Sequence, residues 1–273
     1  MSTFAQLINE AGDHPKQKME IRSALVTGTG TKSLDIISPL LANLVLKQAG
    51  ATILTGLDVT KTNRIPVASG NPAHWVGEEG EAVSFNSPEL TPYSMVAQFI
   101  ISNLLLQQTN DSVEKYLIDL AAKSMAVEIE KAVLGDEDTE IKPKGVFNGA
   151  SKWGETNTYE QILALIHSVE TKNVRPGSFI TNGDTAKTLR AAQKNGYGQI
   201  LDNGTIYGFP CLVTESAVGL AFGGWSDLVI GLYDKIYVVS DPYTAAEKGE
   251  TIITIYFDAS AKLIRETSIA RVK

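Results

Sequence analysis

The clearest periodic pattern in the chain runs from residue 111 to residue 134. Apolar and small side chains recur there every three to four residues, as they do along one face of an α-helix. These positions are Val113, Tyr116, Leu117, Leu120, Ser124 and Val127. Asp111 and Glu114 form a helix-start signal, and Gly135 supplies a stop signal. The pattern therefore predicts a helix that, at 1.5 Å per residue, is roughly 35 Å long.

Helix and strand patterns alternate between residues 155 and 250, which predicts a separate α/β unit. Thr158 and Gln161 form a capping box before the helix pattern "YEQILALIHSVE". The strand "GSFITNG", the helix "DTAKTLRAAQK", a hairpin turned by "DNG" and the strand "DLVIGLYDKIYVVSD" follow in order. Two more strands, "ETIITIYFD" and "AKLIRETSIARV", end the chain. We assign this terminal pair to the unit of the long helix, so the domains are discontinuous in sequence.

The first third of the chain has a different pattern. Residues 1–33 are polar and end in small residues, which indicates an extended arm, and residues 34–48 predict a short helix broken or started near Pro39. In residues 51–86, strand-like pieces are separated by Gly, Asn and Pro and contain few large apolar side chains. They predict a long β-hairpin without a core of its own, followed by the strand "SMVAQFIIS". Such a hairpin needs a partner surface.

Composition narrows the class of protein. The 273 residues are 43% hydrophobic and 20% charged, as in an ordinary globular protein. The net charge of -7 argues against tight nucleic-acid binding by the bulk surface, although a protein that encloses DNA without adhering to it would look the same. No membrane span or signal peptide is indicated, which makes a cytoplasmic product the expectation. The single cysteine, Cys211, lies in an apolar strand pattern and is expected to be structural.

One stretch looks at first like an active site. Residues 74–81 combine His74, Trp75 and the carboxylates Glu78, Glu79 and Glu81. A glycosidase-type carboxylate pair would need a rigid cleft to raise one pKa, and a hairpin without its own core is a poor cleft. An exposed acidic patch that pairs with basic residues on another surface is therefore the favoured interpretation, with an acid/base enzyme kept as the alternative.

Other catalytic and ligand-binding motifs are absent from the sequence. The stretch "GTGTKS" at residues 28–33 does not fit the phosphate-loop pattern, and there is no GxSxG, HExxH or CxxC. The three histidines have no spacing typical of metal ligands. We expect no catalytic residue, no cofactor and no metal, which leaves assembly as the predicted function.

Five phrases in order resemble one protein family. They are the loop phrase "HWVGEEGEA", "KGVFNGAS", "SFITNGDTAKTLRAAQKNGYGQIL", "IYGFPCLVTES" and "LAFGGWSDLVIGLYDKIYVVSD". Together they resemble the major capsid proteins of tailed bacteriophages that have the Hong Kong-phage-type shell fold. The resemblance covers residues from about 34 to the end of the chain.

The resemblance implies an α+β fold with four parts. These are an N-terminal arm at 1–33, an extended β-hairpin loop at 51–86, a peripheral domain at 34–50, 87–154 and 251–273 with the long spine helix, and an axial α/β domain at 155–250. The implied function is a major capsid protein that assembles through pentamers and hexamers into an icosahedral shell around the double-stranded DNA genome of a phage. The extended loop would supply the intersubunit contacts Lys61, Arg64, Trp75, Glu78, Glu79 and Glu81.

The resemblance also implies partners and a location. The main partner is the chain itself, with a portal and room for decoration proteins, while the packaged DNA would be contacted weakly and without sequence specificity. The start at Met1, only some thirty residues before the match, favours a separate scaffolding protein over a removed leader segment. We expect a virion capsid assembled in the cytoplasm of a host bacterium, without membrane contact. An encapsulin-type nanocompartment shell is the alternative.

Some relatives in this family join their subunits by isopeptide bonds, in which a loop lysine attacks an asparagine of a neighbour with the help of a buried glutamate. Lys61, expected near the loop tip, could be such a nucleophile. However, Glu250 stands where the asparagine would be expected and Phe257 where the glutamate would be, and no asparagine follows Asn203. We therefore expect no covalent crosslinking.

Overall fold

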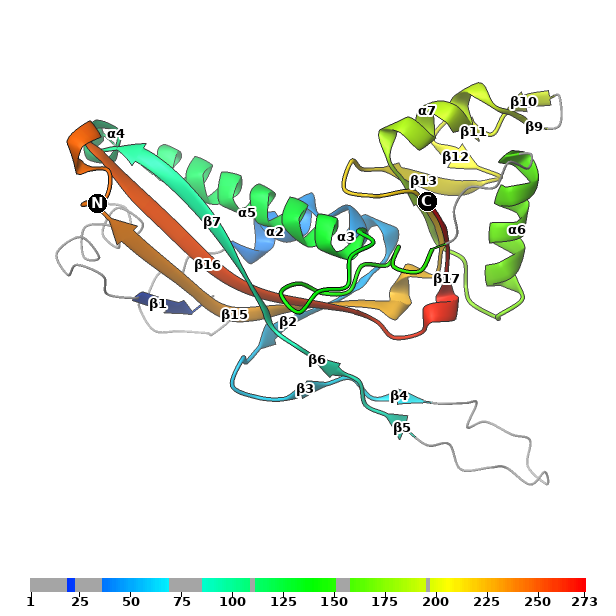
Figure 1. Ribbon diagram of the computed structural model, residues 1–273, viewed down its shortest axis with the longest axis horizontal. Coiled ribbons are helices and arrows are strands. Elements are labelled where there is room, and N and C mark those ends of the chain that lie inside the picture. Colours follow the sequence, from blue (N-terminus) through cyan, green and yellow to red (C-terminus); the bar gives the residue numbers. More distant parts are fainter. Residues whose placement is uncertain (1–18, 23–35, 69–84, 109–110, 151–157, 195–196) are drawn as a thin grey trace.

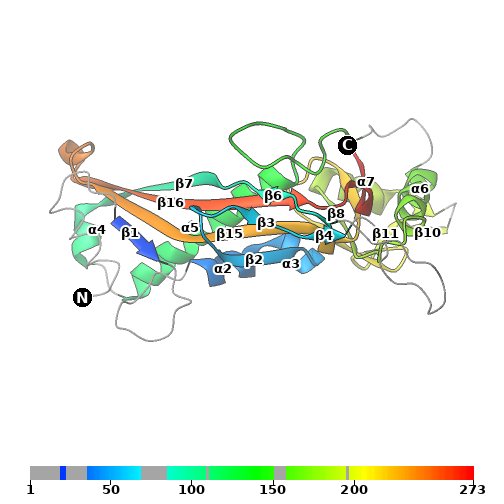
Figure 2. The same ribbon diagram turned by 90° about the horizontal axis from the view of Figure 1, so that it is seen from below.

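The structure is a computed structural model that describes residues 19–22, 36–68, 85–108, 111–150, 158–194 and 197–273. Figure 1 shows two sheets at opposite ends of an elongated molecule, one long and accompanied by a long helix, the other smaller and flanked by helices. A hairpin projects away from both sheets. In the perpendicular view the strands of the long sheet run along most of the molecule (Figure 2).

The long sheet is built on two 14-residue strands, β15 (Leu228–Asp241) and β16 (Glu250–Leu263), which pair antiparallel. β7 (Tyr93–Ser102) pairs with the other edge of β16. Two short strands share the outer edge of β15: β2 (Thr52–Leu57) runs parallel to it and β1 (Met19–Arg22) antiparallel. Residues alternate between the two faces, so that one face carries the buried side chains Ala97, Ile101, Ile253, Ile255, Phe257 and Ala259.

The predicted long helix is confirmed as α5 (Asp111–Val133), which packs against that face and against α2 (Ile37–Asn43). The helix face that we predicted to be apolar is only partly confirmed: Leu117 is half-buried against the core, but Tyr116 is 66% exposed and Leu120 and Val127 are exposed too. The buried apolar side chains are Ala121, Ala122, Met125, Ala126, Ile129 and Val133. The small alanine side chains among them let α5 approach its neighbours closely.

The short helix predicted at residues 34–48 is two helices, α2 and α3 (Val45–Ala49). The expected helix start near Pro39 is confirmed, because α2 begins at Ile37, and the break between the two helices lies at Leu44, which has extended backbone angles. Pro39 lies in the first turn of α2, where a missing N–H leaves no helical hydrogen bond unmade. Gly50 ends α3 in the left-handed conformation, with φ of 100°.

The second sheet has six strands and its own core. Its spatial order is β11 (Leu201–Asp202), β12 (Thr205–Ile206), β13 (Phe209–Val213), β8 (Ser178–Thr181), β14 (Leu220–Gly223) and β17 (Ile269–Val272). The predicted helices α6 (Thr158–Glu170) and α7 (Gly183–Ala191) pack against this sheet. The Asn182 side chain caps α7 by accepting a hydrogen bond from the Thr185 N–H at 2.9 Å.

Strand pairing divides the chain differently from the sequence prediction. β2 was predicted to belong to the extended loop, and β15 to the α/β unit at 155–250, yet both are strands of the long sheet. β17 lies in the predicted range 251–273 but pairs with β14 of the six-stranded sheet. The strand "ETIITIYFD" and the start of "AKLIRETSIARV", predicted as two strands, form one continuous strand. Ala259 and Ser260, which lie between them, stay paired with β15. The chain thus crosses between the sheets more often than local patterns indicate.

The remaining elements are short. The hairpin consists of β3 (Asn63–Arg64) paired with β6 (Glu89–Leu90) and β4 (Val67–Ala68) paired with β5 (Phe85–Asn86). α4 (Asn103–Gln108) follows β7 at the far end of the long sheet (Figure 1). The others are the pair β9 (Gln193–Lys194) and β10 (Tyr197–Gln199), and 3-10 turns at Trp225–Asp227, Ala246–Lys248 and Glu266–Ser268.

Candidate functional site

The projecting hairpin is the feature that the sequence analysis connects most directly with function. Its two ladders contain only two residue pairs each, and the Ile65 N–H donates to the Pro88 carbonyl at 3.0 Å between them. From residue 63 to 67 and from 86 to 90, only Leu90 is buried. This part therefore has no core of its own, as the scarcity of large apolar residues predicted.

The structure places two of the six predicted contact residues. Arg64 lies on β3, exposed, with Glu89 opposite it on β6. Lys61 is 77% exposed and lies before the first ladder, 4.0 Å from the Asp58 carboxylate. It is thus at the base of the hairpin and not near its tip, because β2 draws the preceding residues into the long sheet. Trp75, Glu78, Glu79 and Glu81 lie outside the described residues.

A compact turn fixes the position of Lys61. The Asp58 carboxylate accepts hydrogen bonds from the N–H and hydroxyl of Thr60, at 2.9 and 2.8 Å. These bonds lower the pKa of Asp58 because they favour its charged form. The Asn63 amide donates to the carbonyls of Asp58 and Lys61 at 3.0 and 3.1 Å, which joins the turn to the start of the hairpin.

The returning strand of the hairpin is held to the long sheet by two side chains. The Tyr233 hydroxyl on β15 donates to the Leu90 carbonyl at 3.1 Å, and the Lys262 ammonium on β16 donates to the Glu89 carbonyl at 3.2 Å. Both acceptors are backbone groups, so these bonds fix the path of the chain and not a side chain. The hairpin therefore leaves the sheet from an anchored base.

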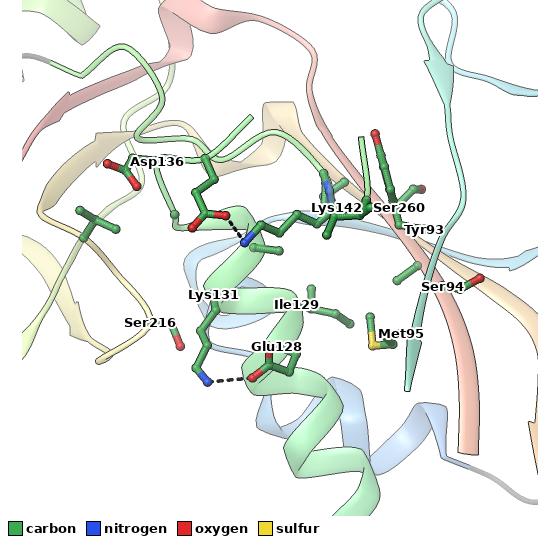
Figure 3. Close-up of a pocket in the computed structure, with 18 residues that line it drawn as sticks. Tyr93, Ser94, Met95, Glu128, Ile129, Lys131, Asp136, Lys142, Ser216 and Ser260 are labelled. Carbon is green, nitrogen blue, oxygen red and sulfur yellow. Dashed lines mark hydrogen bonds and ion pairs between the residues drawn. The ribbon is translucent and has the colours of Figure 1, made fainter. Parts of the chain in front are cut away.

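A groove of about 490 Å³ lies near the end of α5 (Figure 3). Its walls come from α5, β7, β16 and the loop that follows α5, which includes Ile141. Its charged side chains are paired within the chain: Lys131 with Glu128 at 2.7 Å, Lys142 with Glu137, and Lys273 with Asp136 at 2.8 Å. Each of these charges thus has a partner of opposite sign within the chain.

Glu130 is a buried charged residue that the sequence analysis did not single out. Its side chain is on the inner side of α5, with the residue 4% exposed. The carboxylate accepts hydrogen bonds from the Val45 N–H at the start of α3 and from the Thr214 hydroxyl at 3.2 Å. Burial raises the pKa of Glu130, while these bonds oppose the shift. Glu130 thus connects α5, α3 and the segment after β13. In the sequence, a charged residue on the alanine-rich side of the helix could have identified it.

Cys211 has the structural character that its apolar surroundings predicted. It lies half-buried in β13, and burial raises the pKa of its thiol to about 11. A thiol with this pKa is almost entirely protonated at neutral pH and is a poor nucleophile. In the described part of the chain no three His, Cys, Asp or Glu side chains cluster as metal ligands would. Nor is any described helix both long and apolar enough to cross a membrane.

Comparison with known families agrees with this architecture. The family model described as "Phage capsid family" matches residues 29–273, which is most of the chain. The chain belongs to the phage capsid family. The α+β tailed-phage capsid fold expected from the sequence is therefore confirmed, and the family is one of structural proteins.

Two further comparisons place this phage capsid protein among relatives. It is 22% identical to the major capsid protein of Halomonas phage phiHAP-1, over 94% of this chain and 45% of the relative, so it spans about half the relative's length. Among solved structures, the capsid of an empty GTA particle, computed with C5 symmetry, has a TM-score of 0.65 at 17% identity over 98% of each chain. Microbacterium phage Oxtober96 has a TM-score of 0.63 at 13% identity, over 92% of this chain and 93% of the other. These structural likenesses concern the fold.

Proposed function

We propose that the chain is a major capsid protein that assembles through pentamers and hexamers into an icosahedral shell enclosing the double-stranded DNA genome of a phage. The observation that carries this proposal is the projecting hairpin, which is anchored at its base but has no core along its described strands. An isolated two-stranded ribbon is marginal in water, so a neighbouring copy is the natural surface to cover it. Family membership supports the same role.

The surface of the long-sheet unit also supports self-association. Ile100 on β7 is 63% exposed on the sheet face opposite α5, and Tyr116 is exposed on the outer side of α5. Large apolar side chains are thus exposed on two opposite sides of this unit, and both sides offer apolar surface for other subunits to cover. In the proposed shell this unit is the peripheral domain, and the six-stranded sheet with α6 and α7 is the axial domain, which meets its copies around fivefold and sixfold axes.

Within the proposal, the intersubunit contacts of the extended loop include Lys61, Arg64, Trp75, Glu78, Glu79 and Glu81. The described pair Lys61 and Arg64 present exposed positive charge at the hairpin base, and the three glutamates carry negative charge further along the loop. Each exposed ion pair contributes only about 0.2 to 1 kcal/mol, but a closed shell repeats it in every copy. The contacts would weaken at high salt.

The proposal has further parts that follow from the resemblance. A scaffolding protein, a portal and decoration proteins would act with the shell, which would be assembled in the cytoplasm of a host bacterium. The net charge of -7 supports weak and non-specific contact with the packaged DNA. The paired charges of the groove near α5 and the high thiol pKa of Cys211 support a structural role over an enzymatic one.

Replacement of residues 69–84 by a short Gly-Ser linker tests the proposal. The replacement leaves β2 and both hairpin ladders in place, so the two sheets should keep the circular dichroism spectrum and melting temperature of the parent. We expect the parent to form closed shells in electron microscopy and the variant to stop at capsomers or monomers. Normal closed shells from the variant would contradict the role of the loop.

The contents of the particles separate phage capsid from encapsulin. Particles isolated from their source and treated with nuclease on the outside should contain protected double-stranded DNA. Particles that enclose a protein cargo in place of DNA would favour the nanocompartment.

A further inference from the structure

The long strand β15 is irregular at the point where the hairpin meets the sheet. Leu232 pairs with Ala259 and Ile236 with Phe257, so that residues 233–235 lie opposite the single residue Asp258. The register with β2 shifts at the same point, between Gly231 and Tyr233. A β-bulge, in which one strand has extra residues opposite its partner, changes the direction of nearby side chains. Such bulges are frequent where a fold needs a side chain to point in a particular direction.

Tyr233 lies within this irregularity. Its side chain is completely buried, and its hydroxyl donates to the Leu90 carbonyl at 3.1 Å. Leu90 is the last residue of β6, where the returning strand of the hairpin ends. Burial raises the pKa of Tyr233, so its hydroxyl stays a neutral donor at physiological pH. A buried hydrogen bond therefore fixes one of the two points where the hairpin joins the sheet.

Gly231 provides space for both ends of the hairpin. A Cβ at this position would lie 2.7 Å from Leu57 Cδ1 and 3.3 Å from Leu90 Cδ1, as well as 2.5 Å from the Ser260 hydroxyl oxygen. Leu57 ends β2, just before the outgoing strand, and Leu90 ends the returning strand. Both leucines thus pack over the same glycine, and a glycine inside a strand is typical of such close approach.

We infer that Leu57, Leu90, Gly231 and Tyr233, called here the hairpin socket, set the angle at which the hairpin leaves the long sheet. The inference rests on the proposed function, because this angle decides where the hairpin reaches a neighbouring copy. The two-residue ladders provide little stiffness by themselves. The direction of the hairpin is therefore set at its base, and Tyr233 is a positioning residue for assembly.

Tyr233→Phe tests the socket by removing one hydroxyl while keeping the ring. The matched control is Tyr256→Phe, which removes a half-buried hydroxyl from the neighbouring strand β16. In unassembled protein we expect Tyr233→Phe to speed hydrogen exchange of the Ile65 amide about fivefold, as the loss of one buried hydrogen bond would. Exchange in the six-stranded sheet should stay at the parent value, and Tyr256→Phe should leave the Ile65 amide unchanged.

Particle size provides the second measurement. Tyr233→Phe should broaden the distribution of shell diameters in electron microscopy, because a less constrained hairpin meets its neighbour at more than one angle. Gly231→Ala, which pushes both leucines out of the socket, should give misassembled particles while the six-stranded sheet keeps its protection from exchange.

Unchanged Ile65 exchange together with uniform parental shells in Tyr233→Phe would overturn the socket. An equal effect of Tyr256→Phe would also overturn it, because the effect would then belong to the sheet as a whole. Failure of the proposed function would give a different experimental result. Normal shells from the 69–84 replacement would remove the assembly role, while the exchange measurement would still report whether Tyr233 anchors the hairpin.

Discussion

The two sheets of this capsid protein differ in how completely they cover their own apolar side chains. The six-stranded sheet and its helices enclose a compact core that includes a cluster of three phenylalanines. The long sheet has α5 on one face only, and it exposes large apolar side chains at Val96, Ile100, Leu104, Tyr116, Ile141 and Tyr243. The six-stranded unit exposes large apolar side chains too, at Leu163 and Val213, but fewer of them among the described residues. The long-sheet unit therefore has the more extensive surfaces suited to neighbours.

Because of this difference, we expect the residues that determine subunit stability and those that determine assembly to lie in different parts of the chain. Mutations in the core of the six-stranded unit should act on the stability of the subunit, and mutations on the outer surfaces of the long-sheet unit should act on association. The strands and α5 of the long-sheet unit keep a buried interior of their own, so its outward side chains are free to serve contacts.

The largest effect is expected in the phenylalanine cluster. The Phe222 ring stacks on Phe179 at 4.3 Å between centroids and contacts Phe209 edge-on at 5.0 Å. Phe222→Ala should lower the free energy of unfolding by about 3 to 5 kcal/mol, because it leaves a cavity in a closed core. Urea unfolding of unassembled subunits measures this. A loss below 1 kcal/mol would mean that the six-stranded unit is not packed as tightly as its ring contacts indicate.

A smaller effect is expected at Glu130, where the two units meet. Glu130→Ala should cost about 1 to 3 kcal/mol, because the Val45 N–H and the Thr214 hydroxyl lose a buried acceptor. Glu128→Ala, an exposed position on the same helix, is the matched control and should change stability little.

The pH dependence of Glu130 has a definite sign. Its pKa in the folded protein is raised above 4.5, so the folded state binds more protons than the unfolded state between the two values. The contribution of Glu130 to stability is thus greatest below pH 4.5 and declines as pH rises through the raised value. Relative to Glu130→Gln, which does not titrate, the parent should lose stability over this interval in urea titrations. A parallel pH profile for the two proteins would contradict the raised pKa.

The exposed apolar residues should affect association and leave the subunit nearly unchanged. Ile100→Ser and Tyr116→Ser are each expected to alter the free energy of unfolding by less than about 0.5 kcal/mol, as exposed positions usually do. If neighbours bury these side chains, each substitution should raise the protein concentration needed for shells about tenfold or more. Light scattering over a concentration series measures this. An equal response to Leu163→Ser, on α6 of the six-stranded unit, would remove the contrast between the two units.

Local patterns in the sequence predicted most elements but few of the pairings. The helices at 111–133 and 158–170 have start signals and regular apolar spacing in the sequence, which are local properties. The pairing of β2 with residues 229–233 joins segments far apart in the chain, so no local pattern identifies it. The same holds for β17, which lies only a few residues after β16 yet pairs in the other sheet.

The sequence predicted that the candidate site is a hairpin, but it did not predict the position of Lys61 or the contact of Tyr233 with the hairpin. The small number of large apolar residues between 51 and 86 predicted a hairpin without a core, and the structure shows paired hairpin strands in the described part from residue 63 onward, whereas β2 belongs to the long sheet. The position of Lys61 depended on where the sheet ends and the hairpin begins, which is decided by the long-range pairing of β2. Tyr233 lies in an ordinary apolar run, where only Gly231 inside the strand pattern hints at a close approach.

The smallest effect expected is none: assembled shells should not crosslink through isopeptide bonds. Lys61 lies beside Asp58 at the hairpin base, Glu250 begins β16 opposite Ser102, and the side chain of Phe257 is buried in the core. A lysine attacking Glu250 would meet a carboxyl group that has no ammonia to release, and Phe257 offers no proton acceptor. Shells boiled in denaturant should therefore run on a gel as one band near 29.4 kDa, like unassembled subunits run beside them. A ladder of covalent oligomers that disappears in Lys61→Arg would show that Lys61 finds another acceptor on its neighbour.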